Sequence, residues 1–257
     1  MRMTGNGDFG KKVFFLHPPG VINDVAGILA RSEFETYLVK DHERLKRWLA
    51  RHPESIVFVN LDEGLPEPQW EAWVRGLMGD EATRLVGVGV VTLTGSPELS
   101  EKYLIDIGVA CGFVVVKVGV AKTAEILVKT LEANEARGKR KFVRVPCADS
   151  GVELNFSDGE KSVKAAVLDL SVAGLTCRLE EGRRPAPRTL LRGMHLSLKG
   201  VPLFADGIYV GSREEAGAAT DLVMFDPRSL DDDKKDKIRS FGRKVLQARM
   251  DEELAAV

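Results

Sequence analysis

Five cationic side chains and no carboxylate fall within the eight residues Arg137–Arg144. Inside this run Arg140 and Arg144 stand four residues apart, and Lys139 directly precedes the first of them. A guanidinium group presents paired N–H donors that fit two phosphate oxygens, or the O6 and N7 edge of a guanine. The run is compatible with an anion site, although a basic run by itself is usually a solvated face or a nonspecific basic patch.

A second polar group begins 25 residues after Arg144, where an apolar run ends and Asp169, Ser171 and Gly174 follow. A carboxylate can accept hydrogen bonds from the N1–H and N2–H groups of a guanine, and a hydroxyl can bond to a base or a phosphate. Glycine allows close approach of a backbone. Taken alone, this stretch is also an ordinary turn whose Asp and Ser side chains bond to nearby N–H groups.

The two groups together resemble the two-part signature of PilZ domains, over roughly residues 136–254. That resemblance implies an antiparallel β-barrel with a closing helix, and a bacterial receptor for cyclic di-GMP (c-di-GMP). One or two ligand molecules are expected, and the residue before the first arginine is thought to influence which. The residues that the resemblance assigns to the ligand are Lys139, Arg140, Arg144, Asp169, Ser171 and Gly174.

The second half of the chain has the pattern of an antiparallel barrel, because short apolar strands follow one another with turn residues between them. A helix is expected over 230–254, with Asp231, Asp232 and Asp233 in its first turn, where negative charge is favourable. Its packing stripe is Ile238, Phe241, Val245 and Leu246. The expected strands are 152–156, 162–170, 175–179, 193–198, 203–210 and 221–225.

The first half alternates strands and helices, which predicts an α/β domain with an open, doubly wound parallel sheet. Its strands are continuously apolar, as in a sheet covered by helices on both faces. Asp41 suits the N-cap of one helix. The expected strands are 12–16, 55–61, 84–94 and 112–118, and the expected helices are 21–30, 41–51 and 122–135.

The order of these elements resembles a response-regulator receiver over roughly residues 11–130. Receivers carry paired carboxylates after the first strand to hold Mg²⁺ during phosphoryl transfer. Here His17-Pro18-Pro19 stands at that place, so a degenerate receiver is expected, used for contacts. The residues that carry the resemblance are Asp62, Pro66, Thr92 or Thr94, and Lys117.

Length and charge agree with a two-domain protein without a polyanionic partner. The chain has 257 residues, with 37 Lys and Arg against 38 Asp and Glu. Three separated cysteines and four histidines show no metal-ligand spacing, and a reducing cytoplasm is expected. The expected divisions are a disordered tail 1–10, a receiver-like domain 11–130, a lead-in segment 131–144 and a barrel with its helix 145–257.

The sequence thus predicts a c-di-GMP receptor without catalytic activity, which passes its signal by interdomain rearrangement to a protein partner. Direct DNA binding and membrane insertion are not expected. Two alternatives stay open: a response regulator phosphorylated at Asp62, and an adaptor that binds proteins without a ligand. The Arg- and Pro-rich stretch 182–188 is interpreted as a solvated loop.

Overall fold

The computed structural model describes residues 10–148, 150–158, 161–179, 184–215 and 218–257. All but Gly10 of the expected disordered tail therefore lies outside the described residues. The chain divides into two compact units. The first runs to Lys141 and also includes Gln247–Val257, and the second is Phe142–Leu246. Each is described here by itself.

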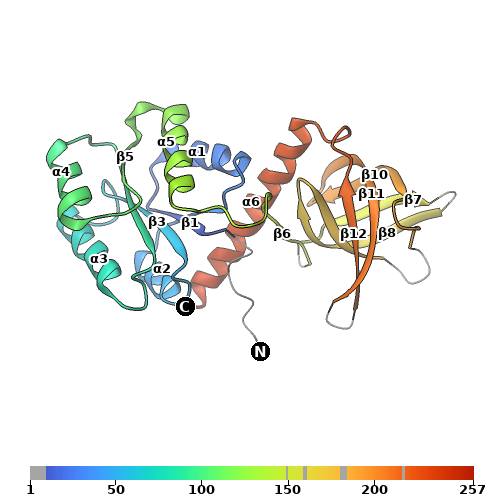
Figure 1. Cartoon of the computed structure of the whole chain (residues 1–257), viewed down its shortest axis with the longest axis horizontal. Coiled ribbons are helices and arrows are strands. Elements are labelled where there is room, and N and C mark those ends of the chain that lie inside the picture. The colour runs from blue at the N-terminus through green and yellow to red at the C-terminus, as the bar shows by residue number, and fades with distance from the viewer. Residues whose placement is uncertain (1–9, 149, 159–160, 180–183, 216–217) are drawn as a thin grey trace. The chain divides into compact units, whose positions relative to one another are not determined.

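The first unit contains a five-stranded sheet in which every neighbouring pair is parallel, and this confirms the predicted doubly wound α/β architecture (Figure 1). The short strand β2 was not anticipated from the sequence. Every residue of β3 is buried, as its unbroken apolar run predicts. From one edge to the other the strands are β2 (Thr36–Val39), β1 (Lys12–Leu16), β3 (Ser55–Asn60), β4 (Gly87–Thr92) and β5 (Phe113–Val115).

Helices cover both faces of this sheet. Helices α1 (Gly20–Arg31) and α5 (Val120–Ala133) share one apolar core with the strands. On the other face α2 (His42–Leu49) brings Trp48 edge-on to Phe14 of β1, with 5.1 Å between ring centroids. The Asp41 carboxylate accepts a hydrogen bond from the Arg44 N–H at 2.9 Å, which confirms the predicted N-cap. The remaining helices are α3 (Glu67–Gly79), α4 (Pro97–Glu101), a π-helical turn (Lys102–Ile107) and a 3₁₀ turn (Val116–Val118).

The outer edge of β2 is capped by a side chain from the far end of the chain. The amide of Gln247 accepts a hydrogen bond from the Leu38 N–H at 2.9 Å and donates one to the Leu38 carbonyl at 3.0 Å. This pair of bonds reproduces what a neighbouring strand would supply, so a part of the sheet edge is no longer open to another chain. Nearby, the Trp48 indole N–H donates to the Glu253 carboxylate at 3.0 Å.

The second unit is a closed antiparallel barrel. Its sheet runs β6-β8-β7-β10-β11-β12-β9, and pairing of β8 with β9 joins the two ends, so that β6 lies outside the ring. Apolar side chains of alternate residues fill the interior. The strands are β6 (Val145–Pro146), β7 (Glu153–Asp158), β8 (Lys161–Ser171), β9 (Gly174–Leu179), β10 (Leu190–Leu198), β11 (Val201–Glu215) and β12 (Ala218–Phe225).

A β-bulge in β8 changes which side chains face outward. Val167 pairs with Cys177, but the next pair is Asp169 with Thr176, so Leu168 is an extra residue. Val167 and Leu170 are both buried in the core, which strict alternation would not allow. The bulge therefore turns Asp169 to the outer surface of the barrel. The carbonyl group of the extra residue accepts a hydrogen bond from the Cys147 N–H at 2.7 Å.

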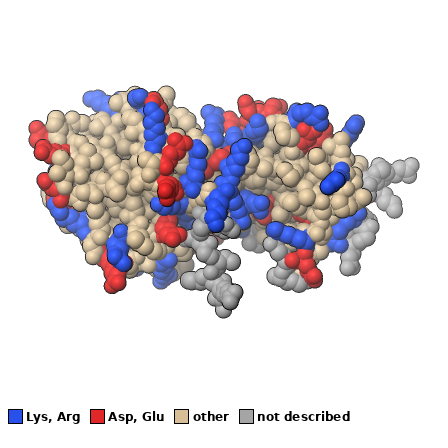
Figure 2. Space-filling model, viewed as in Figure 1, with Lys and Arg blue, Asp and Glu red and all other residues tan. Residues whose placement is uncertain are grey.

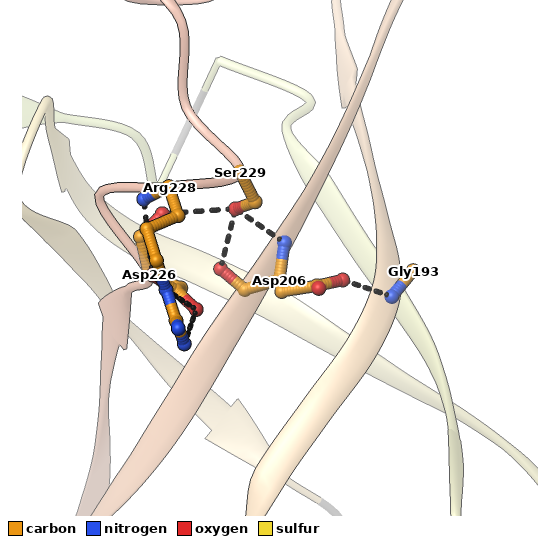
Figure 3. A network of polar contacts seen from close by, with 5 residues as sticks. All are labelled: Gly193, Asp206, Asp226, Arg228 and Ser229. Atoms are coloured by element: carbon orange, nitrogen blue, oxygen red, sulfur yellow. Dashed lines mark hydrogen bonds and ion pairs between the residues drawn. The ribbon is translucent and has the colours of Figure 1, made fainter.

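A polar network fixes the turn that leads from the barrel into helix α6 (Asp232–Ala255), as Figure 3 shows. The Asp206 carboxylate of β11 accepts from the Gly193 N–H of β10 at 2.7 Å, and the Asp206 N–H donates to the Ser229 hydroxyl at 2.8 Å. Arg228 and Asp226 form an ion pair at 2.9 Å. Beyond this turn the predicted packing stripe is confirmed, because Ile238, Phe241 and Val245 are buried in the barrel core and Leu246 packs against it.

None of the helices in the described part of the chain contains an apolar stretch of membrane-spanning length. No group of three or more His, Cys, Asp or Glu side chains there could hold a metal ion. On the face shown in Figure 2, Lys and Arg side chains are interspersed with Asp and Glu, in keeping with the net charge of -1.

Gln247→Ala is expected to destabilise the first unit by about 1–3 kcal/mol, because two hydrogen bonds to the β2 backbone are lost. Gln69→Ala is the matched control, since Gln69 is an exposed residue of helix α3 in the same unit. Urea unfolding followed by tryptophan fluorescence reports on this unit, which holds all three tryptophans. Equal midpoints for both variants would contradict the capping role.

Candidate ligand-binding site

A pocket of about 150 Å³ opens on the outer surface of the barrel, next to the β8–β9 hairpin. Four of the six residues singled out in the sequence line it, at one place where β6, β8 and β9 meet. Its remaining lining is apolar and comes from the hairpin turn, from β9 and from β12. The lining residues are Arg144, Asp169, Ser171, Ala173, Gly174, Leu175, Leu222 and Met224.

Arg144 is brought to the pocket by the short strand that follows it. Val145 pairs with Leu170 and Pro146 pairs with Asp169, so β6 runs antiparallel along the last residues of β8. Val145 is buried in the core and thereby anchors this end of the lead-in segment. The Arg144 guanidinium lies 3.8 Å from the Asp169 carboxylate, with about a third of each side chain exposed. Such an exposed pair is weak and can be separated by a ligand.

The Asp169 carboxylate is held by a hydrogen bond from a buried side chain of the barrel. Its Oδ2 atom accepts a hydrogen bond from the Thr176 hydroxyl at 2.7 Å, while Oδ1 is the atom nearest to Arg144. Thr176 lies opposite Asp169 in the β8–β9 ladder and is 3% exposed. The buried hydroxyl therefore fixes the carboxylate orientation, and carboxylate lone pairs are left that can accept donors from a ligand.

Ser171 and Gly174 close the hairpin that borders the pocket. The Ser171 hydroxyl accepts from the Ala173 N–H at 3.3 Å and donates to the Gly174 carbonyl at 3.2 Å. A Cβ atom at Gly174 would stand 2.3 Å from the Val223 carbonyl oxygen of β12. The sequence explained this glycine by approach of a ligand, whereas the structure shows that close packing of β9 on β12 already requires it.

The chemistry of the pocket suits a ligand that carries both an anion and a set of donors. Arg144 can form paired hydrogen bonds to a phosphate or a guanine edge. Asp169 accepts donors such as the N1–H and N2–H of guanine. A phosphate alone would meet the neighbouring carboxylate unfavourably, so the combination of charges favours a guanine nucleotide over a simple anion.

The other two predicted residues are not among those that line the pocket. Lys139 and Arg140 are exposed residues in the irregular segment between α5 and β6, and they belong to the first unit. Upstream, Arg137 is anchored in that unit, where its guanidinium lies 3.0 Å from the Glu132 carboxylate and 4.9 Å from the Phe34 ring centroid. The segment is therefore fixed at Arg137 and again at Val145.

At the carboxyl edge of the parallel sheet, Asp62 lies just after β3 and is held by residues at the end of β4. Asp62 accepts hydrogen bonds from the Thr92 hydroxyl at 3.0 Å and the Leu93 N–H at 2.6 Å. His17 stands where receivers carry their acidic pair, and its ring lies 5.6 Å from that of Trp70. Lys117 is exposed in the 3₁₀ turn after β5, beyond the strand whose end it was expected to form.

A buried carboxylate in the barrel was missed at the sequence level. Asp221 of β12 is fully buried and accepts hydrogen bonds from the Tyr209 hydroxyl at 2.8 Å and the Arg184 Nε–H at 3.0 Å. Burial and this carboxylate raise the pKa of Tyr209 to about 12. The sequence predicted that Arg184 belongs to a solvated loop, but its guanidinium binds the buried carboxylate of Asp221. Residues 182 and 183 lie outside the described part.

Comparison with solved structures returned proteins of both expected kinds, each aligned to about half of this chain. YcgR from Escherichia coli in complex with c-di-GMP matches with a TM-score of 0.39 and 11% identity, over 47% of this chain and 50% of that one. The PilZ domain of YcgR with c-di-GMP matches with a TM-score of 0.37 and 12% identity, over 46% and 98%. The response regulator RPA3017 of R. palustris matches with a TM-score of 0.39 and 17% identity, over 48% and 92%.

The chain thus resembles PilZ proteins on one hand and a response regulator on the other, as its sequence suggested. A scan against models of known protein families gave no match, and neither did a search of curated proteins. The chain spans about half the length of the full YcgR chain.

Gly174→Ala is expected to destabilise the barrel by about 1–3 kcal/mol, since the added methyl group must displace the Val223 carbonyl group. Gly20→Ala serves as the control because no atom outside the local chain lies within 4 Å of the added carbon there. Thermal unfolding by circular dichroism compares the two. A Gly174→Ala protein as stable as the control would show that β9 and β12 are less tightly packed than described.

The stability of the first unit is expected to decrease as the pH is lowered, because of His17. Burial, followed by the charge of His42, lowers the pKa of His17 below its ordinary value, and its Nε2 atom is buried without a hydrogen-bond partner. The unfolded chain therefore binds a proton at His17 at about pH 6.5, whereas the folded unit binds it only at a lower pH. Protonation thus favours the unfolded state, and the stability of the unit decreases as the pH falls through about 6.5.

Unfolding of His17→Gln between about pH 7.5 and about pH 5.5 measures this effect, in a window that brackets the ordinary histidine pKa. His52 contributes in the same direction, since burial also lowers its pKa. The His17 variant should accordingly lose part of the wild-type pH dependence. Identical pH profiles for the two proteins would refute the role of His17.

Proposed function

We propose that the barrel is a receptor for c-di-GMP, which binds at the pocket formed by Arg144, Asp169, Ser171 and Gly174. The observation that carries the proposal is that Arg144 lines one pocket with Asp169, Ser171 and Gly174, which begin 25 residues later in the sequence. A guanidinium and a carboxylate 3.8 Å apart complement a ligand that presents guanine donors and phosphate oxygens together. The resemblance of the two motifs to PilZ domains supports the same ligand.

Arg140 and Lys139, in the lead-in segment, are proposed to bind the ligand as well. Four residues of extended chain span at most about 14 Å, so Arg140 stays within that distance of Arg144 in every conformation of the segment. The lead-in segment lies between the contacts of Arg137 and buried Val145. Ligand binding would change the conformation of this short segment so that Arg140 and Arg144 close over the anion. One or two c-di-GMP molecules fit the proposal.

The first unit is proposed to pass the signal to a protein partner. Ordering of the segment between α5 and β6 changes the chain that leaves α5, and this would reposition the receiver-like unit. Phosphorylation at Asp62 is the less favoured alternative, because His17 occupies the place of the acidic pair and cannot hold Mg²⁺ with oxygen ligands. The proposal includes no catalytic step.

Isothermal titration of the full chain with c-di-GMP tests the site. Arg144→Ala is expected to weaken binding about 10- to 100-fold, which corresponds to the loss of about 1.5–3 kcal/mol from a charged hydrogen-bonded contact. Arg140→Ala should weaken it as well. Lys164→Ala is the control, since it removes an exposed cation from the same strand as Asp169 but away from the pocket.

A wild-type protein that takes up no c-di-GMP would overturn the proposed function. Equal losses for Arg144→Ala and Lys164→Ala would show a nonspecific charge effect and would overturn the site assignment. Full retention of affinity in Arg140→Ala would remove the lead-in segment from the proposal.

A further inference from the structure

The pocket is too small to hold the proposed ligand alone. It measures about 150 Å³, whereas sites that enclose an organic ligand usually measure about 300–1,000 Å³. A cyclic dinucleotide with two purines must therefore extend beyond the pocket onto the barrel surface next to it. The surface at the β12 side of the pocket is apolar, through Leu222 and Met224.

An exposed apolar row continues from that side of the pocket across three strands. Met224 of β12 pairs with Gly174 of β9 on one side and with Ile208 of β11 on the other, and Ile208 pairs with Leu190 of β10. These three side chains are 50%, 41% and 43% exposed. We call Met224, Ile208 and Leu190 the apolar row.

The row is level with the polar end of the pocket. Gly174 pairs with Ser171 in the hairpin, so Ser171, Gly174, Met224, Ile208 and Leu190 lie at successive positions across neighbouring strands. Neighbouring strands are about 4.8 Å apart, so the path from Gly174 to Leu190 along the curved barrel wall measures about 14 Å. Gly174 has no side chain to interrupt the path from the pocket to the row.

We propose that the apolar row is a second part of the ligand site, on which a purine face of the nucleotide lies while the pocket holds its polar edge. This inference rests on the proposed function and specifies how the ligand is placed. Met224 and Ile208 lie on neighbouring strands of the outer barrel surface, and their apolar side chains suit the face of a base, which is broad, planar and poor in hydrogen-bond donors. Met224 adds a flexible, polarisable side chain that adjusts to such a face.

Neutral substitutions test the row without adding charge near an anionic ligand. Ile208→Ser and Met224→Ser are each expected to weaken c-di-GMP binding about five- to tenfold in isothermal titration, because part of the apolar contact with the base is lost. Val201→Ser is the matched control. Val201 is 49% exposed on the same strand as Ile208, but it pairs with Leu198 at the other end of β11.

Failure of the inference and failure of the proposed function give different results. If the wild-type protein binds c-di-GMP and both row variants retain its affinity, the row is not a ligand surface although the receptor proposal stands. An equal loss of c-di-GMP affinity in Val201→Ser and Ile208→Ser would also show that the row is not a ligand surface. No binding by the wild-type protein would overturn the proposed function itself.

A second measurement uses the unaltered chain and does not depend on how the variants fold. In protein labelled with ¹³C at its methionine methyl groups, c-di-GMP should move the Met224 signal upfield, because the methyl group then lies over a purine ring. The signal of Met194, which is fully buried in the barrel, provides the internal reference. Met224→Leu assigns the signal. A Met224 signal that moves no more than the Met194 signal at saturating ligand would overturn the inference.

Discussion

The extra residue in β8 is the constraint on which the candidate site depends. Alternation along a strand would place Val167 and Asp169 on the same face, and Val167 belongs to the barrel core. A carboxylate in that core would lose its hydration, and the bulge at Leu168 avoids this by turning Asp169 outward. The same change of phase keeps Leu170 buried and sets Asp169 beside the end of β6. Arg144, which directly precedes β6, reaches the carboxylate for this reason.

Packing on the other side of the hairpin is equally restrictive. Gly174 leaves room for the Val223 carbonyl, and the Ser171 hydroxyl bonds to backbone groups within the turn. Two of the motif residues thus shape the hairpin, whereas Arg144 and Asp169 present their charged groups at its edge. This division explains how one short motif can serve both the fold and a ligand.

The sequence predicted those features that follow from local patterns. Buried parallel strands such as β3 are continuously apolar, and Asp41 has the side chain and position of an N-cap, so both were recognised. Short β2 was missed because its four residues include Thr36 and Tyr37 and lack a long apolar run. The contact of Gln247 with Leu38 joins residues 209 positions apart, and no local pattern reveals it. The bulge at Leu168 was likewise hidden, since the apolar run appears unbroken without knowledge of which residues pair across the ladder.

Hydrogen–deuterium exchange of the whole protein, with and without c-di-GMP, tests most directly whether the ligand binds where β6 meets the β8–β9 hairpin. We expect slower exchange on ligand addition in peptides that cover residues 139–147 and 169–175, because the ligand covers the lead-in segment and the hairpin. Ligand-dependent protection confined to other parts of the chain, with unchanged exchange in these two stretches, would show that the ligand binds elsewhere.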